Sequence, residues 1–317
     1  MPSSKKSSII LKSVLAVLAL ALAGGAYFIY FIVPEKVAQT IMAKAPLHKP
    51  LSLTPKEYGL KYEDVSTNGN GVTLSGWWLS TPKKPLGTVL LTHGVFKNRE
   101  QVLTRAEFLV KNGYQVLLFD QRGNGLSSNS PTSGGVFESG DFLIWIPYLK
   151  DHKRLQKPLV FFGFSMGSMS ALRAAVKEPE ADAVIADSPL ANLKSYVSRR
   201  TIGGRFSSMP GFLNRCLQAY DRLSGLSLTA VDLDMIPIVE QLHELPVLYI
   251  TGEGDDLAKS DEVRILFEKT ASHRRRLVYI PDAGHEETYS KFPIIYKKAV
   301  VDFLTDLTAK PKKEETE

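Results

Sequence analysis

The chain has 317 residues, enough for one large globular domain with appendages, and its 44% apolar and 23% charged residues are an ordinary globular composition. A single cysteine, Cys216, excludes an internal disulfide. The net charge of +6 is spread thinly, and no Lys/Arg block is interleaved with aromatic residues, so nucleic-acid binding has little support.

The N-terminus is the plainly non-globular part. After a basic tail at residues 1–12, residues 13–33 carry no charge and are long enough to span a bilayer as a helix, which Pro34 is expected to end. A cleaved signal peptide is the competing interpretation, because Ala21-Leu22-Ala23 resembles a cleavage site, and a buried core helix is another. The apolar run continues through Val33, past that site, so an uncleaved membrane anchor is favoured.

The orientation of this anchor follows from its short basic tail. Lysines before and after the span are balanced, so charge bias hardly decides the topology. A short basic tail ahead of a first apolar segment usually stays inside. We therefore expect a single-pass membrane protein with its N-terminus inside and an extracytoplasmic catalytic domain.

After a linker at residues 34–57, strands alternate with helices through residues 58–307. A hairpin is expected first, because Asn68-Gly69-Asn70-Gly71 supplies residues that accept positive φ. Further strands are expected at residues 88–92, 115–119, 159–162, 183–186, 246–250 and 276–280, with helices at 105–112, 139–149 and 294–307. This alternation predicts an α/β fold with a doubly wound, mostly parallel sheet. A charged tail at residues 308–317 is expected to be disordered.

One pentapeptide organises the chain: Gly163-Phe164-Ser165-Met166-Gly167. An apolar strand precedes it and a helical apolar pattern follows it, which is the context that a nucleophile elbow requires. We expect Ser165 to sit on a strained turn with its hydroxyl projecting above the sheet edge. The flanking glycines are expected because side chains there would collide with the neighbouring strand and helix.

A serine nucleophile needs a base, and the base needs an orienting carboxylate. In a parallel sheet the functional residues gather at the carboxyl ends of the strands. His285 directly follows the last expected strand and is the predicted base. Asp255, after the strand before it, is the predicted acid, with Asp256 as the second choice and Asp187 as a rival at another strand end.

The oxyanion of a tetrahedral intermediate needs preorganised donors. The backbone N–H groups of Met166, one residue past the nucleophile, and of Val95, in the loop after the 88–92 strand, are the candidates. His93 in the same loop is expected to brace it by hydrogen bonds. No metal and no organic cofactor is implied.

These residues in the order Ser165, Asp255, His285 resemble the α/β-hydrolase superfamily over residues 58–307. Within it, the chain is similar to a branch of membrane-anchored serine hydrolases that includes bacterial hydrolases and eukaryotic α/β-hydrolase-domain thioesterases. His93-Gly94, the stretch from Asp120 to Ser127, and Gly284-His285 fit that pattern, although the family commonly has histidine where Asn124 stands. The resemblance implies the α/β-hydrolase fold, with residues 188–245 as a helical cap over the nucleophile. An ordinary pair of surface helices is the alternative for that insertion.

The leading hypothesis is a serine hydrolase that cleaves a carboxylic ester or thioester, on a small-molecule or lipid-like substrate, through an acyl-enzyme. A serine peptidase is an alternative in the same class. From another class, a non-catalytic, membrane-tethered binding protein on a hydrolase scaffold predicts a broken triad, whereas all three positions are filled.

Overall fold

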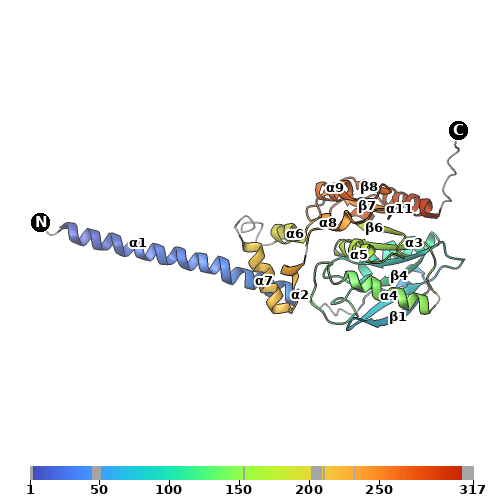
Figure 1. Cartoon of the computed structure of the whole chain (residues 1–317), viewed down its shortest axis with the longest axis horizontal. Helices are drawn as coiled ribbons and strands as arrows, with labels where there is room; N and C mark the ends of the chain where they lie inside the picture. The colour runs from blue at the N-terminus through green and yellow to red at the C-terminus, as the bar shows by residue number, and fades with distance from the viewer. Residues whose placement is uncertain are drawn as a thin grey trace. The chain divides into compact units, whose positions relative to one another are not determined.

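The computed structural model describes residues 3–44, 51–152, 154–200, 209, 211–231 and 233–308 (Figure 1). It divides into two compact units. The helical unit comprises Met1–Ala43 and Val197–Val231, and the sheet unit comprises Lys44–Tyr196 and Asp232–Glu317. The tail expected at residues 308–317 lies outside the described residues from position 309 onward.

The sheet unit is built on eight strands in the order β1-β2-β4-β3-β5-β6-β7-β8. The pairs β1–β2 and β2–β4 are antiparallel, and the other five pairs are parallel. The strands are β1 (Tyr62–Gly69), β2 (Val72–Leu79), β3 (Thr88–Thr92), β4 (Gln115–Phe119), β5 (Leu159–Phe164), β6 (Ala183–Asp187), β7 (Val247–Gly252) and β8 (Arg275–Ile280). The expected mostly parallel sheet with an opening hairpin is therefore confirmed.

The hairpin turn follows from two residues with positive φ. Asn70 and Gly71 have φ of 49° and 76°, and Gly69 pairs with Val72. A two-residue turn with both φ positive matches the right-handed twist of the strands that it joins, which is why asparagine and glycine stand there.

Helices cover both faces of this sheet, as a doubly wound fold requires. Residues of α4, α5, α8 and α9 pack with one face of the strands, and residues of α3 and α11 pack with the other face. The helices and helical turns of this unit are η2 (Pro55–Tyr58), η3 (Arg99–Val102), α3 (Leu103–Lys111), α4 (Ser139–Asp151), α5 (Met166–Lys177), α8 (Ile236–Val239), α9 (Ser260–Lys269), α10 (Thr288–Lys291) and α11 (Pro293–Thr308). The two apolar cores fix the sheet, and with it the strand ends that carry the site.

The helical unit begins with a helix that does not end where the sequence suggested. α1 (Ser3–Tyr27) passes into a π-helical turn, η1 (Phe28–Ile32), and then into α2 (Val33–Lys44). The linker expected from residue 34 is thus helical up to Lys44. Proline normally breaks a helix because it lacks an N–H and its ring meets the carbonyl four residues earlier. Here a π-helical turn ends at Ile32, two residues before Pro34, and the helix continues past the proline.

The insertion between β6 and β7 is divided between the two units. α6 (Leu193–Arg200) leaves the sheet unit, and α7 (Phe212–Ser224) and η5 (Leu228–Ala230) belong to the helical unit. Residues 201–208, 210 and 232 lie outside the described residues. α7 packs against the N-terminal helix through Phe212 and Cys216, which form a buried cluster with Val33. The part of the predicted cap that the structure describes is therefore largely helical, and its covering of the nucleophile stays a prediction.

Candidate active site

The elbow lies where β5 ends and α5 begins. Ser165 has φ of 54° and ψ of −117°, a strained conformation for a residue other than glycine. A Cβ added at Gly163 would lie 2.0 Å from the Gly167 carbonyl carbon, and one added at Gly167 would lie 2.6 Å from the His93 carbonyl oxygen. The reason expected for both glycines, collision with the helix and with the neighbouring strand end, is thus confirmed.

The three residues chosen from the sequence come together in one chain of hydrogen bonds. His285 Nε2 lies 2.8 Å from Ser165 Oγ, and its Nδ1 lies 2.8 Å from Asp255 Oδ2. Because a carboxylate only accepts, Nδ1 carries the proton and Nε2 is left to accept from the serine hydroxyl. The arrangement suits proton transfer from the hydroxyl to the imidazole.

Asp255 is itself held in place by its own loop. Its Oδ1 accepts hydrogen bonds from the backbone N–H groups of Leu257 at 2.9 Å and Ala258 at 2.8 Å, and the residue is only 5% exposed. Asp256, the second choice, has an exposed side chain. The loop therefore turns one carboxylate toward His285 and the next toward solvent.

Asp187, the rival acid, is bound elsewhere. Its buried carboxylate accepts from Arg105 Nη2 at 2.8 Å, Tyr296 Oη at 2.8 Å and Thr288 Oγ1 at 2.9 Å. Its backbone carbonyl accepts from the Ser165 N–H at 2.8 Å. Burial raises the pKa of Tyr296, and the adjacent Asp187 carboxylate raises it further, so the phenol stays a hydrogen-bond donor.

This Arg105–Asp187 cluster is the part of the site's surroundings that the sequence reasoning missed. Through the Asp187 backbone it is joined to the turn at Ser165, and through Thr288 it is joined to the segment after His285. The Arg105 guanidinium also lies 4.9 Å from the Phe164 ring centroid, and the Phe164 ring lies 5.3 Å from the His285 ring. Only the strand-end position of Asp187 hinted at it in the sequence.

The loop after β3 passes close to Ser165. A Cβ added at Gly94 would lie 3.3 Å from Ser165 Cβ. The Gly94 N–H donates to Gln101 Oε1 at 2.9 Å, whereas no acceptor for the Val95 N–H occurs within the described residues. Met166 opens α5, so its N–H has no partner within the helix. Within the part of the chain that the structure describes, neither candidate oxyanion donor gives its backbone N–H to another protein group.

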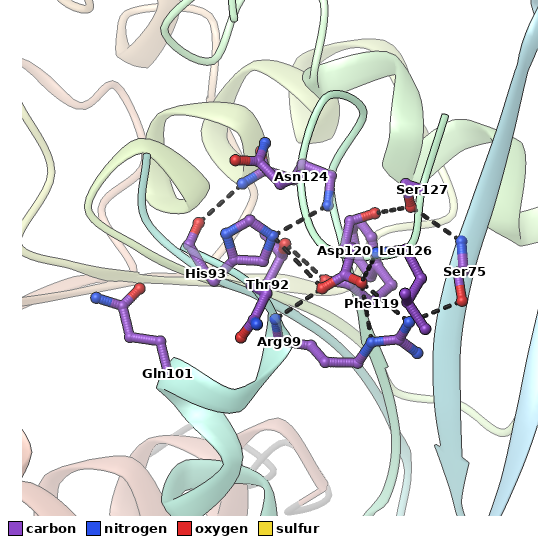
Figure 2. Close-up of polar contacts among 12 residues, drawn as sticks. Ser75, Thr92, His93, Arg99, Gln101, Phe119, Asp120, Asn124, Leu126 and Ser127 are labelled. Atoms are coloured by element: carbon purple, nitrogen blue, oxygen red, sulfur yellow. Dashed lines mark hydrogen bonds and ion pairs between the residues drawn. The ribbon is translucent and has the colours of Figure 1, made fainter. Parts of the chain in front are cut away.

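His93 braces this loop, as expected, and Figure 2 shows its surroundings. Its Nδ1 lies 2.8 Å from the Gly94 carbonyl oxygen, so Nδ1 carries the proton, and its Nε2 accepts from the Gln121 N–H at 3.2 Å. The Gln121 side chain donates back to the His93 carbonyl at 2.8 Å. Complete burial lowers the pKa of His93, so the imidazole stays neutral.

His93 and Gln121 join the loop after β3 to the loop after β4, and we call this connection the brace. The loop after β4 is held by a buried ion pair between Arg99 and Asp120 (Figure 2). Asp120 Oδ1 accepts from the Arg99 N–H at 2.7 Å, and its Oδ2 accepts from Arg99 Nε at 3.0 Å and from the Leu126 N–H at 2.9 Å. Asn124, where the family commonly has histidine, donates to the Arg122 carbonyl at 3.0 Å within its own turn. This departure is thus confined to the turn. Among the described residues no group of three His, Cys, Asp or Glu side chains could hold a metal ion.

The fold and this geometry agree with the known proteins that the chain resembles. A family model described as the α/β hydrolase fold matches residues 87–243. An esterase of Pyrococcus furiosus, Pf2001, has a structure that is 29% identical, with a TM-score of 0.70, over 84% of this chain and 98% of that one. The YqkD protein of Bacillus subtilis is 27% identical over 77% of this chain and 79% of its own length. The bem46 protein of Schizosaccharomyces pombe is 24% identical over 80% of each chain.

The class that fold and site define is that of the α/β hydrolases, with an eight-stranded, mostly parallel sheet and the elbow after β5. The chain has the α/β-hydrolase fold, and its match to the family model and its likeness to the Pf2001 esterase agree with that class. Its likeness to an esterase supports a hydrolytic function.

Proposed function

We propose that the protein is a serine hydrolase that cleaves a carboxylic ester or thioester through an acyl-enzyme, with Ser165, His285 and Asp255 as its triad. The observation that carries the proposal is the unbroken hydrogen-bond chain from Ser165 Oγ through the imidazole to Asp255, at a serine with positive φ. The strained turn holds the hydroxyl out of the sheet, at the point where a substrate carbonyl can approach.

The reaction divides into two halves. Ser165 Oγ attacks the carbonyl carbon while His285 Nε2 takes the hydroxyl proton, and the protonated imidazole then gives that proton to the leaving alcohol or thiol. Water repeats the sequence on the acyl-enzyme and releases the acid. Asp255 keeps the Nδ1 proton in place and stabilises the imidazolium in both halves. The N–H groups of Met166 and Val95 hold the oxyanion.

We also propose that the N-terminal helix anchors this hydrolase in a membrane, with the N-terminus inside and the sheet unit outside the cytoplasm. Residues 8–42 form one helix that is long and apolar enough to cross a bilayer, and its most apolar stretch is almost entirely exposed. Large apolar side chains along it are exposed, Leu20 by 73% and Leu22 by 75%. Such side chains are stable in hydrocarbon and costly in water.

The nucleophile is tested by Ser165→Ala. We expect the variant to lose hydrolysis of a water-soluble p-nitrophenyl ester and labelling by a fluorophosphonate probe, while its circular dichroism and melting temperature stay close to those of the parent. Ser290→Ala, at an exposed serine, is the matched control and should keep both activities. Labelling that survives Ser165→Ala would remove Ser165 from the nucleophile role.

The substrate class needs a second measurement. Rates on short- and long-chain esters, the corresponding acyl thioesters, and peptide amides should place esters or thioesters above amides by orders of magnitude. Preferred amide cleavage would favour the peptidase. Absence of turnover, with probe labelling also absent in the parent, would favour the non-catalytic binding protein.

A further inference from the structure

The helix that begins the chain is too long to lie within a bilayer. It runs without a break from Ser3 to Lys44, which at about 1.5 Å per residue makes it about 63 Å long. The hydrocarbon core is about 30 Å thick, which the uncharged residues 13–33 match on their own. The remaining turns, through α2, must lie outside the hydrocarbon.

Burial along this helix changes at the same place. Val33 is 8% exposed in a cluster with Phe212 and Cys216 of α7, which are 0% and 4% exposed. Ile29 and Val37 pack on the cluster one turn to either side. Since residues four apart share one face of a helix, the three form a single stripe that α7 covers. α7 therefore begins at the depth where the span leaves the hydrocarbon.

The side chains around this contact are those that membrane interfaces favour. Tyr27, Phe28 and Phe31 are more than half exposed. The Arg215 guanidinium of α7 lies 4.6 Å from the Phe31 ring centroid, and Arg222 pairs with Glu35 one turn beyond Phe31. Aromatic rings gather at the headgroup level, and arginine binds phosphate there while its cation faces a ring.

We propose that α7 is an interfacial helix, packed on the membrane-proximal end of the anchor and held at headgroup depth, where Arg215 contacts lipid phosphate. The partner is thus the bilayer surface itself. This inference rests on the proposed anchor, but it assigns a membrane-facing role to α7, a segment far from the anchor in the sequence.

Depth-dependent quenching tests the proposal in the full-length protein. A fluorophore is attached through Asn214→Cys, at an exposed position of α7, or through Leu20→Cys, in mid-span. Burial raises the pKa of the native Cys216 to about 11, so its thiol reacts slowly, and the parent chain measures the background. The proteins are placed in phosphatidylcholine vesicles with spin labels on either the headgroup or the middle of the acyl chain.

We expect the Leu20 label to be quenched by the acyl-chain spin label and the Asn214 label by the headgroup spin label. If Leu20 is quenched and Asn214 is quenched by neither, the anchor stands and the interfacial helix is wrong. If Leu20 is quenched by neither, the anchor itself fails, and the inference fails with it.

Two further variants examine the contacts. Val33→Cys should form a disulfide with the native Cys216 on mild oxidation, whereas Leu20→Cys should not. Disulfide formation in both variants or in neither would contradict the packing of Val33 on α7. Arg215→Gln should lower headgroup quenching of the Asn214 label about twofold or more, because glutamine cannot replace the charged, bidentate hydrogen bonds of a guanidinium to lipid phosphate. Arg264→Gln, on the exposed face of α9, is the matched control and should change nothing. Unchanged quenching in Arg215→Gln would remove the phosphate contact.

Discussion

At the scale of single residues, the choice of the acid shows how far a sequence can narrow a site. Three carboxylates stand within four residues after β7, and any of them satisfies the rule that the acid follows that strand. The Asp255 carboxylate lies 2.8 Å from His285 Nδ1, because the backbone N–H groups of Leu257 and Ala258 hold it in place. The Asp256 side chain faces solvent. Neighbouring side chains in this loop point in opposite directions, and the spacing of residues in the sequence does not tell which of them faces the histidine.

Replacing this acid should cost most of the activity. In Asp255→Asn the amide favours the wrong imidazole tautomer, so we expect kcat to fall by about three to four orders of magnitude with little change in the melting temperature. Asp256→Asn should retain nearly full activity. Steady-state kinetics on one ester compares kcat of the two variants. A larger loss of kcat in Asp256→Asn than in Asp255→Asn would identify Asp256 as the acid that orients His285.

The Arg105–Asp187 cluster makes a prediction about positioning. Thr288→Val removes the hydroxyl that ties the His285 loop to Asp187, and we expect kcat to fall roughly 10-fold at an unchanged KM, since small misplacement of a reacting group is costly. Thr288→Ser should restore kcat because it keeps the hydroxyl. A fall in thermal stability with no change in kcat would make the cluster merely structural.

At the scale of elements, the strands buried on both faces were the most predictable part. β3 and β4 have the bounds expected from their unbroken apolar runs, and α11 differs from its prediction by one residue at each end. The placement of β4 between β2 and β3 could not be predicted, because local patterns do not encode which strands pair. The burial of the Arg105 side chain could not be predicted either, because in the sequence Arg105 is one charged residue among several on an amphipathic helix.

The strand–elbow–helix unit should tolerate no side chain at Gly163. In Gly163→Ala the added methyl would lie 2.0 Å from the backbone of Gly167, so we expect a loss of about 3 kcal/mol or more in the free energy of unfolding. Gly140→Ala, whose added methyl would meet only the end of the Arg122 side chain at 3.4 Å, should be neutral or stabilising. Urea unfolding gives the free energy of unfolding of both variants. Equal values would show that the backbone around Ser165 can shift to make room for the added methyl group.

The brace between the loops after β3 and β4 should make stability depend on pH. The folded-state pKa of His93 is lowered by burial, so below about pH 6.5, the ordinary value, the unfolded chain takes up a proton that the folded chain refuses. This contribution to stability is therefore lost as the pH falls from about 6.5 toward the lowered value. His93→Asn should have a shallower slope of unfolding free energy between about pH 6.5 and pH 5, and an unchanged slope would contradict this account.

At the scale of the whole molecule, the N-terminal helix does more than serve as the proposed membrane anchor, because it also packs against α7. The sequence predicts that a chain lacking residues 1–36 is soluble and active, because more than twenty residues separate the apolar span at 13–33 from the first strand. The structure instead packs Val33 against Phe212 and Cys216, contacts between segments that no local pattern could connect.

Removal of the whole helix should therefore expose α7. In a chain lacking residues 1–44 we expect Cys216 to react with a thiol reagent at least about tenfold faster than in a chain lacking residues 1–27, because only the shorter deletion keeps the stripe that covers it. Both chains should hydrolyse a water-soluble ester. Equal thiol reactivity would mean that Cys216 is buried by other parts of the molecule.

The unbroken passage from α1 through η1 to α2 has a mechanical consequence. Tyr27 and Val33, at the two junctions, keep helical dihedral angles, so the proposed anchor has no loop at the bilayer surface that could act as a hinge. Helices adjust to thinner membranes by tilting. With no hinge to absorb that tilt, α7 must swing with the helix on which it packs. In this proposal the thickness of the bilayer sets the tilt of the helix, and the tilt exerts a force on the segment between β6 and β7. A thicker membrane should reduce the tilt.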